Sequence, residues 1–130
     1  MTRQAACSCG QLRLEVDGEP VRVSVCHCLA CQRRTGSVFG AQARFVEKDV
    51  RIEGRHTDYT RISDDGEERT FSFCPECGAT VFFELDSAPG FIAVPVGAFA
   101  DPSFPPAVRS IYESRKHSWV VMPDFVEHIN

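Results

Sequence analysis

The chain has 130 residues, a length that suits one domain with a packed core, so we predict a single domain over residues 1–130. Its 43% hydrophobic content excludes a disordered chain, and its formal net charge of −4 disfavours a nucleic-acid-binding protein. The sequence has no apolar signal segment and no apolar run of about eighteen residues, so we expect a cytoplasmic protein that does not bind membranes.

Short stretches in which apolar and polar residues alternate recur along the chain, and a period of two residues is typical of β-strands. We predict strands at 12–16, 21–25, 38–46, 69–73, 80–85, 91–96 and 108–112. Turn sequences that contain Asp, Gly and Pro separate several of these stretches, for example at 17–20 and 87–90. The fold class is therefore predicted to be all-β or nearly so.

The pattern supports one short helix, a turn or two at 28–34, because Pro, Gly or β-branched residues interrupt every other stretch with helical spacing. Aromatic residues on alternating strands are buried by default. We therefore expect Phe82, Phe83 and Trp119 to belong to the core rather than to a binding surface.

Seven cysteines occur in three close clusters, and an odd number at such spacing suits metal coordination better than a set of disulfides. The clusters are Cys7-x-Cys9, Cys26-x-Cys28-x-x-Cys31 and Cys74-x-x-Cys77. Structural zinc takes four ligands in a tetrahedron, and the segment from Cys74 to Gly78 has the form of a tight turn that supplies two of them. The sequence therefore predicts at least one structural zinc.

The other two ligands could come from Cys7 and Cys9 or from the three-cysteine cluster. The ligand count favours the first choice, because it leaves a complete three-ligand set with a vacant fourth position, as in catalytic zinc sites. The alternative is a single structural zinc with the remaining cysteines idle. A redox dithiol at Cys28-x-x-Cys31 is disfavoured, since the surrounding β pattern lacks the strand–helix context of thioredoxin-like sites.

The cysteine segments at 7–10, 26–34 and 73–78 resemble, in order and in spacing, those of the glutathione-dependent formaldehyde-activating enzyme and centromere protein V family. The similarity continues through residues 96–102 to Ser118-Trp119 and so covers about residues 5 to 122. Three positions depart from the residues usual in that family, namely Phe99, Ala100 and Ser118.

The resemblance implies a tent-like fold of packed antiparallel β-sheets, held together by a structural zinc on Cys7, Cys9, Cys74 and Cys77. It implies a second, catalytic zinc on Cys26, Cys28 and Cys31. The implied activity is that of a carbon–sulfur lyase resembling S-(hydroxymethyl)glutathione synthase, which joins glutathione to formaldehyde. The expected partner is therefore a small-molecule thiol or its adduct with a small aldehyde.

Zinc lowers the pKa of a bound thiol, and the resulting thiolate would be the nucleophile. The charge that develops on the aldehyde oxygen needs a proton donor, and the sequence leaves the choice open among His27, His56 and His117. For His27 we favour an imidazole that faces solvent or bonds to the backbone. Arg33 and Arg34 carry forked donors that suit glutathione carboxylates, while exposed arginines that only add solubility are the simpler interpretation.

A second hypothesis is a non-enzymatic, zinc-bound β module that binds a protein or a small ligand. It is motivated by the absence of an evident general base and by the departure at Ala100. The sequence leaves the oligomeric state open.

Overall fold

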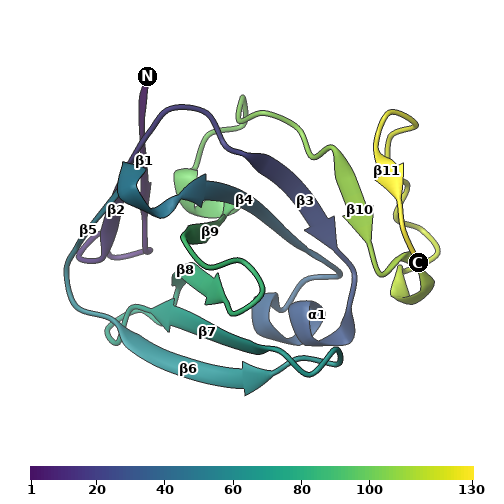
Figure 1. Ribbon diagram of the computed structural model, residues 1–130, viewed down its shortest axis with the longest axis horizontal. Coiled ribbons are helices and arrows are strands. Elements are labelled where there is room, and N and C mark those ends of the chain that lie inside the picture. Colours follow the sequence, from purple (N-terminus) through teal and green to yellow (C-terminus); the bar gives the residue numbers. More distant parts are fainter.

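The computed structural model describes residues 1–130, and most of its regular structure is β (Figure 1). A small sheet has the order β1–β2–β5, formed by β1 (Thr2–Ala6), β2 (Arg13–Asp17) and β5 (Val50–Glu53). The large sheet contains β3 (Arg22–Cys26), β4 (Gly40–Val46), β6 (Thr57–Ile62), β7 (Glu68–Phe73), β8 (Thr80–Leu85), β9 (Phe91–Pro95), β10 (Arg109–Ile111) and β11 (Glu127–His128). Its order is β11–β10–β3–β4–β9–β8–β7–β6.

The remaining regular elements are short. They are one α-helix, α1 (Leu29–Thr35), and three 3₁₀ turns, η1 (Glu47–Asp49), η2 (Val96–Phe99) and η3 (Glu113–Arg115). No helix is long and apolar enough to cross a membrane.

The all-β prediction is confirmed, and each of the seven predicted strands overlaps an observed one. The helix predicted at 28–34 is α1, shifted by one residue because Cys28 forms its N-cap. Four strands were missed: β1, β5, β6 and β11. β5, β6 and β11 are largely exposed, so they do not show the alternation of buried and exposed residues on which the prediction depended, and β1 has no apolar residue larger than Ala.

The expectation of purely antiparallel sheets needs one correction. β10 pairs in parallel with both β3 and β11, whereas all other pairs are antiparallel. The long connection 100–108 crosses back from β9 to the far side of β3, and residues 112–126 connect β10 to β11; parallel pairs require long connections of this kind.

The main core lies between the small sheet and the middle of the large sheet. It includes Leu14 and Val16 from β2, Phe45 from β4, and Ile92 and Val94 from β9, all 2% exposed or less. Burying such side chains is the chief source of stability for a domain of this size.

Two of the three aromatic residues assigned to the core are buried, Phe82 in this main core and Phe83 in a smaller cluster with Phe71 and Ala93. The prediction for Trp119 was wrong, because its side chain is 70% exposed. Trp119 follows η3 in an irregular segment that no sheet covers, and its one aromatic neighbour is His117.

The opposite face of the large sheet holds α1. Figure 1 shows α1 between β3, on one side of the curved sheet, and β7, on the other. Close packing depends on Gly40 in β4, where an added Cβ would lie 3.5 Å from Cβ of Cys31 and 3.1 Å from the guanidinium of Arg34. The glycine therefore brings α1 and its cysteine against the sheet.

Candidate metal centres

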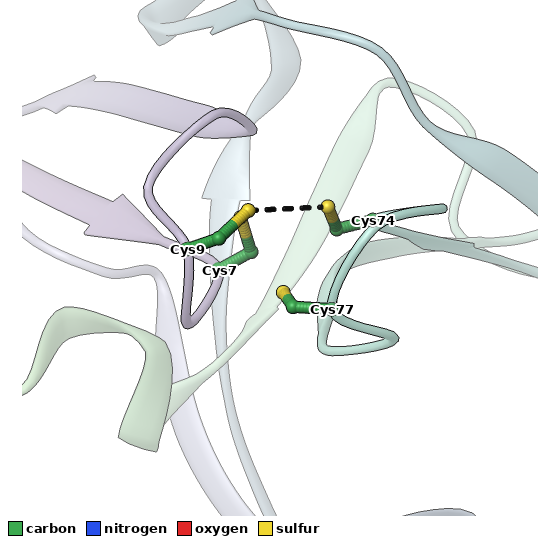
Figure 2. Close-up of side chains that lie close together, drawn as sticks. All are labelled: Cys7, Cys9, Cys74 and Cys77. Atoms are coloured by element: carbon green, nitrogen blue, oxygen red, sulfur yellow. Dashed lines mark hydrogen bonds between the residues drawn. The ribbon is translucent and has the colours of Figure 1, made fainter.

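The first group of sulfurs joins two turns that are far apart in the sequence. Cys7 and Cys9 come from the turn after β1, and Cys74 and Cys77 from the turn after β7 (Figure 2). The four Sγ atoms lie within 4.8 Å of one another. Sγ of Cys9 lies 3.7 Å from Sγ of Cys7 and from Sγ of Cys74.

These distances fit a tetrahedral zinc site. Sulfurs bound about 2.3 Å from a tetrahedral zinc lie about 3.8 Å from one another. The donor set, four thiols with no competing carboxylate, is also the one that structural zinc prefers. We call these residues the four-cysteine group: Cys7, Cys9, Cys74 and Cys77.

The two turns have one kind of backbone hydrogen bond in common. The amide N–H of the first cysteine donates to a carbonyl five residues later, Cys7 to Leu12 and Cys74 to Ala79, each at 3.0 Å. Each first sulfur also accepts a backbone N–H, from Leu12 and from Glu76, both at 3.3 Å. Such donors stabilise thiolates, so the local sequence prepares both turns to bind metal.

Gln11 links the four-cysteine group to the chain after β5. Its Nε2 donates to Sγ of Cys74 at 3.0 Å and to the carbonyl of Arg55 at 2.7 Å, while its Oε1 accepts the Arg55 N–H. Burial raises the pKa of the Cys74 thiol, but the hydrogen bonds from Gln11 and from nearby backbone amides lower it to about 6. No local sequence signal points to Gln11, because its partner Arg55 lies 44 residues away.

We expect Gly54→Ala to destabilise the protein and weaken zinc binding. Gly54 has φ +105°, and an added Cβ would lie 2.1 Å from the carbonyl oxygen of Gln11. Steric overlap with backbone, added to the cost of a positive φ, should lower the free energy of unfolding by about 3 kcal/mol or more. Thermal unfolding checks this result.

The control for that variant is Gly97→Ala, since Gly97 has open space around it and no positive φ. It should leave both thermal stability and zinc content unchanged. Equal effects from the two substitutions would contradict the role given to Gly54.

The second group of sulfurs, the three-cysteine group, lies where β3 meets α1. Cys26 ends β3, Cys28 caps α1 and Cys31 lies within it. Their Sγ atoms also lie within 4.8 Å of one another, and Sγ of Cys28 accepts the amide N–H of Cys31 at 3.3 Å. Hydrogen bonds from the other two thiols lower the pKa of Cys28 to about 2, and the same contacts raise that of Cys26. Cys28 is therefore held as a thiolate, the form that a metal needs, whereas the raised pKa values of Cys26 and Cys31 keep these two thiols protonated until a metal displaces the protons.

One cavity adjoins the three-cysteine group, and a second lies next to that cavity. The first, of about 20 Å³, is lined by Cys26 and Cys28 and bordered by Arg61, Arg69 and Tyr112. A larger pocket of about 490 Å³ shares Arg61 with it, and we call this the α1 pocket. Its other lining residues are Ala30, Arg33, Arg34, Tyr59, Phe71, Phe73, Gly78 and Thr80. The cysteines thus border a site with cationic and aromatic walls.

The sequence profile of the glutathione-dependent formaldehyde-activating enzymes matches residues 2–118. The chain belongs to this family. A search of the curated proteins finds no match. Among solved structures, the chain is similar to the crystal structure of a Rhodobacter sphaeroides protein from structural genomics, with 24% identity and a TM-score of 0.58. That similarity covers 73% of this chain and 85% of the other, and it supports the fold alone.

Membership of the formaldehyde-activating family confirms the resemblance inferred from the cysteine segments. The match ends at residue 118, so the segment from Trp119 onward, including β11, lies beyond it.

The structure corrects the expectation for His27, whose side chain is 0% exposed rather than facing solvent. Its Nε2 lies 2.9 Å from Oγ of Ser110, a side chain and not the backbone. Its Nδ1 is buried without a partner, and burial lowers its pKa. His27 follows directly on β3, and the neighbouring strand β10, which carries Ser110, covers it.

None of the three candidate histidines lines the cavity at Cys26 and Cys28. His56 pairs with Asp58 at 2.7 Å, and His117 with Oε1 of Gln32 at 2.9 Å. Besides the cysteines, the ionisable side chains that do border it are Arg61, Asp64, Arg69 and Tyr112, and no local sequence signal points to them. The non-glycine positive φ of Tyr112, 56°, is visible only in the structure.

Arg33 and Arg34 differ in their surroundings. Arg33 is exposed, whereas the guanidinium carbon of Arg34 lies 5.2 Å from the ring centres of both Phe71 and Phe83. Nε of Arg34 is buried and has no partner. Cation–π contacts of this kind hold an arginine in place, so Arg34 is more than a solubilising residue.

Proposed function

We propose that this protein is a zinc-dependent carbon–sulfur lyase that adds glutathione, or a related small thiol, to formaldehyde or another small aldehyde. The observation that carries this proposal is the position of the three-cysteine group beside the arginine-lined α1 pocket. Membership of the formaldehyde-activating family supports it.

The four-cysteine group would hold a structural zinc, and Cys26, Cys28 and Cys31 would hold a second one. When bound at the three-cysteine group, zinc would supply Lewis acidity and keep a thiol in its thiolate form at neutral pH. The three protein ligands match the number found at catalytic zinc, where a fourth position is left for a substrate.

The α1 pocket would bind and orient the thiol. Arg34 and Arg61 can pair with its carboxylates through forked donors, and Arg33 adds charge at the exposed rim. Phe71 holds both inner guanidinium groups, since those of Arg34 and Arg61 lie 5.2 and 5.3 Å from its ring centre. A thiol anchored there by its carboxylates can direct its sulfur past Ala30 to the cysteines, because Ala30 and Arg61 line both cavities.

Tyr112 would donate the proton that the reaction needs. When the thiolate sulfur attacks the aldehyde carbon, a C–S bond forms and the electron pair of the C=O bond moves to the oxygen. That oxygen then takes a proton, and the thiol proton lost to solvent balances it. Burial raises the pKa of Tyr112, so its hydroxyl is protonated at neutral pH, and it borders the same cavity as Cys26 and Cys28.

The proposed reaction can be tested by mixing zinc-loaded protein with glutathione and ¹³C-formaldehyde. Exchange spectroscopy measures the rate at which free aldehyde and its thiol adduct interconvert. We expect a rate above that of the uncatalysed reaction, together with saturable glutathione binding by calorimetry. No acceleration and no binding would reject the proposal and favour the non-enzymatic zinc module, which requires one zinc per chain and an empty three-cysteine group.

We expect Arg34→Gln to raise KM for glutathione by about ten- to a hundredfold, because one charge-assisted hydrogen bond contributes roughly 1.5–3 kcal/mol and about 1.4 kcal/mol is a factor of ten. The kcat should change little, since Arg34 contacts the anchoring end of the thiol. Arg13→Gln is the matched control, because Arg13 pairs with Glu53 at the surface of the small sheet. A loss of kcat without a rise in KM would contradict the binding role.

A further inference from the structure

Half of the arginines lie on one face of the large sheet, although the chain carries a net charge of −4. Arg22 and Arg44 are paired directly across β3 and β4, and Arg109 lies opposite Ser24, the second residue after Arg22. Arg61 and Arg69 are paired across β6 and β7. With Arg34 from α1 packed onto Phe71 and Phe83, six of twelve arginines gather here.

A cavity of about 60 Å³ lies among three of these arginines, Arg22, Arg44 and Arg69. The small side chain of Ala93 leaves this volume unfilled, because Ala93 lies between Arg44 on β4 and Phe83 on β8. A buried water needs about 10–15 Å³ of such volume. The cavity therefore has room for a group of a few heavy atoms, the size of a carboxylate or a phosphate.

The charges around this cavity are not balanced by the protein. No carboxylate lines it, and neither Arg22 nor Arg44 forms a salt bridge. Arg69 reaches Asp65 at 3.3 Å with one terminal nitrogen, but its Nε is buried without a partner. Burial, then repulsion from Arg22, Arg109 and Arg69, lowers the pKa of Arg44. The guanidinium carbon of Arg44 lies 5.9 Å from the ring centre of Phe91, but like charges held opposite one another across strands still destabilise a sheet.

Polar groups beside the arginines also have unused hydrogen-bonding capacity. Nε2 of Gln42 donates to Oγ of Ser24 at 3.1 Å, and both residues line the cavity. Oε1 of Gln42 is buried without a partner. Since a terminal amide can turn over, this glutamine can accept from the Ser24 hydroxyl and present its NH₂ to an anion.

We propose that Arg22, Arg44 and Arg69 form a binding site for a compact anion, a carboxylate or a phosphate group. The site shares no lining residue with the α1 pocket. Arg69 also borders the cavity at Cys26 and Cys28, so a bound anion lies across Arg69 from the three-cysteine group. The bound group is either a carboxylate of the thiol substrate or a separate, free anion. Only the first of these two cases rests on the proposed function.

The site can be tested by titrating zinc-loaded protein with inorganic phosphate and with acetate, in a buffer low in chloride, by calorimetry and thermal unfolding. We expect saturable binding of one anion per chain. Arg44→Gln and Arg22→Gln should each weaken it about tenfold or more, as expected for the loss of a charge-assisted hydrogen bond. The matched control, Arg13→Gln, removes the same charge from the other sheet and should bind as the wild type does.

A second readout separates binding from a structural role. Without added anion, Arg44→Gln should unfold at a higher temperature than the wild type, because it removes repulsion among the arginines. Absence of saturable binding would reject the site. Equal weakening of anion binding in Arg13→Gln would also reject it, and would indicate general charge screening. If Arg44→Gln fails to fold, Arg22→Gln carries the same test.

Competition with glutathione distinguishes the two sources. If glutathione displaces phosphate, the site holds a carboxylate of the thiol. If both bind independently, the site serves a free anion. Phosphate binding is measured without any reaction, so failure of the lyase proposal and failure of this site give different results.

Discussion

Cys74→Ser is expected to release the structural zinc and to unfold most of the chain. Cys74 is fully buried, with 0% exposure. Its Sγ accepts a hydrogen bond from Nε2 of Gln11 and lies 3.7 Å from Sγ of Cys9. Zinc sites of this type contribute about 10–16 kcal/mol to folding, as much as the whole stability of a typical domain. We expect the midpoint of thermal unfolding to fall by more than about 15 °C, since 1 kcal/mol corresponds to about 3–5 °C at this size.

Cys77→Ser separates metal loss from a packing defect. Cys77 is exposed, so its replacement leaves the core intact, yet it removes the same kind of ligand. Similar losses of stability and zinc in both variants indicate that the metal ties the two turns together. A stable Cys77→Ser protein that keeps its full zinc content by elemental analysis would contradict the four-cysteine assignment.

Cys28→Ser is expected to keep the fold, lose the second zinc and reduce the rate of thiol addition to the uncatalysed level. Cys28 is half-buried and caps α1, with its sulfur accepting the N–H of Cys31. Serine is a preferred N-cap residue, so the helix should keep its first hydrogen bond. Zinc content should fall from two ions per chain to one, with a shift of only a few degrees in thermal unfolding.

The comparison of Cys28→Ser with Cys74→Ser tests how the seven cysteines are divided. Equal loss of thermal stability in the two variants would argue against one structural and one catalytic group. Full activity of Cys28→Ser with one zinc per chain would show that the reaction does not take place at the three-cysteine group.

The short-range features of the fold could be predicted from the sequence. Strand β2 lies with one face in the core and alternates buried and exposed residues, while β8 and β9 are short apolar stretches buried on both faces, and both patterns leave a local signal in the sequence. The edge strand β6 has five of six residues exposed, so it shows no such pattern. The exposed position of Trp119 was equally unpredictable, because it depends on the lack of any covering element after η3.

The sequence by itself determined the three cysteine clusters, since Cys-x-Cys and Cys-x-x-Cys spacing brings sulfurs together within one turn, but it left open which clusters share a metal. Long-range folding brings the turn after β1 beside the turn after β7 and so places Cys7 and Cys9 next to Cys74 and Cys77. Only the tertiary structure decided what surrounds them. Gln11 reaches Cys74 because Gly54 allows the chains to approach, and Tyr112 reaches the three-cysteine group because β10 crosses back beside β3. Strand order and curvature also gather six arginines on one face of an acidic chain, and such long-range positions leave no periodic signal in the sequence.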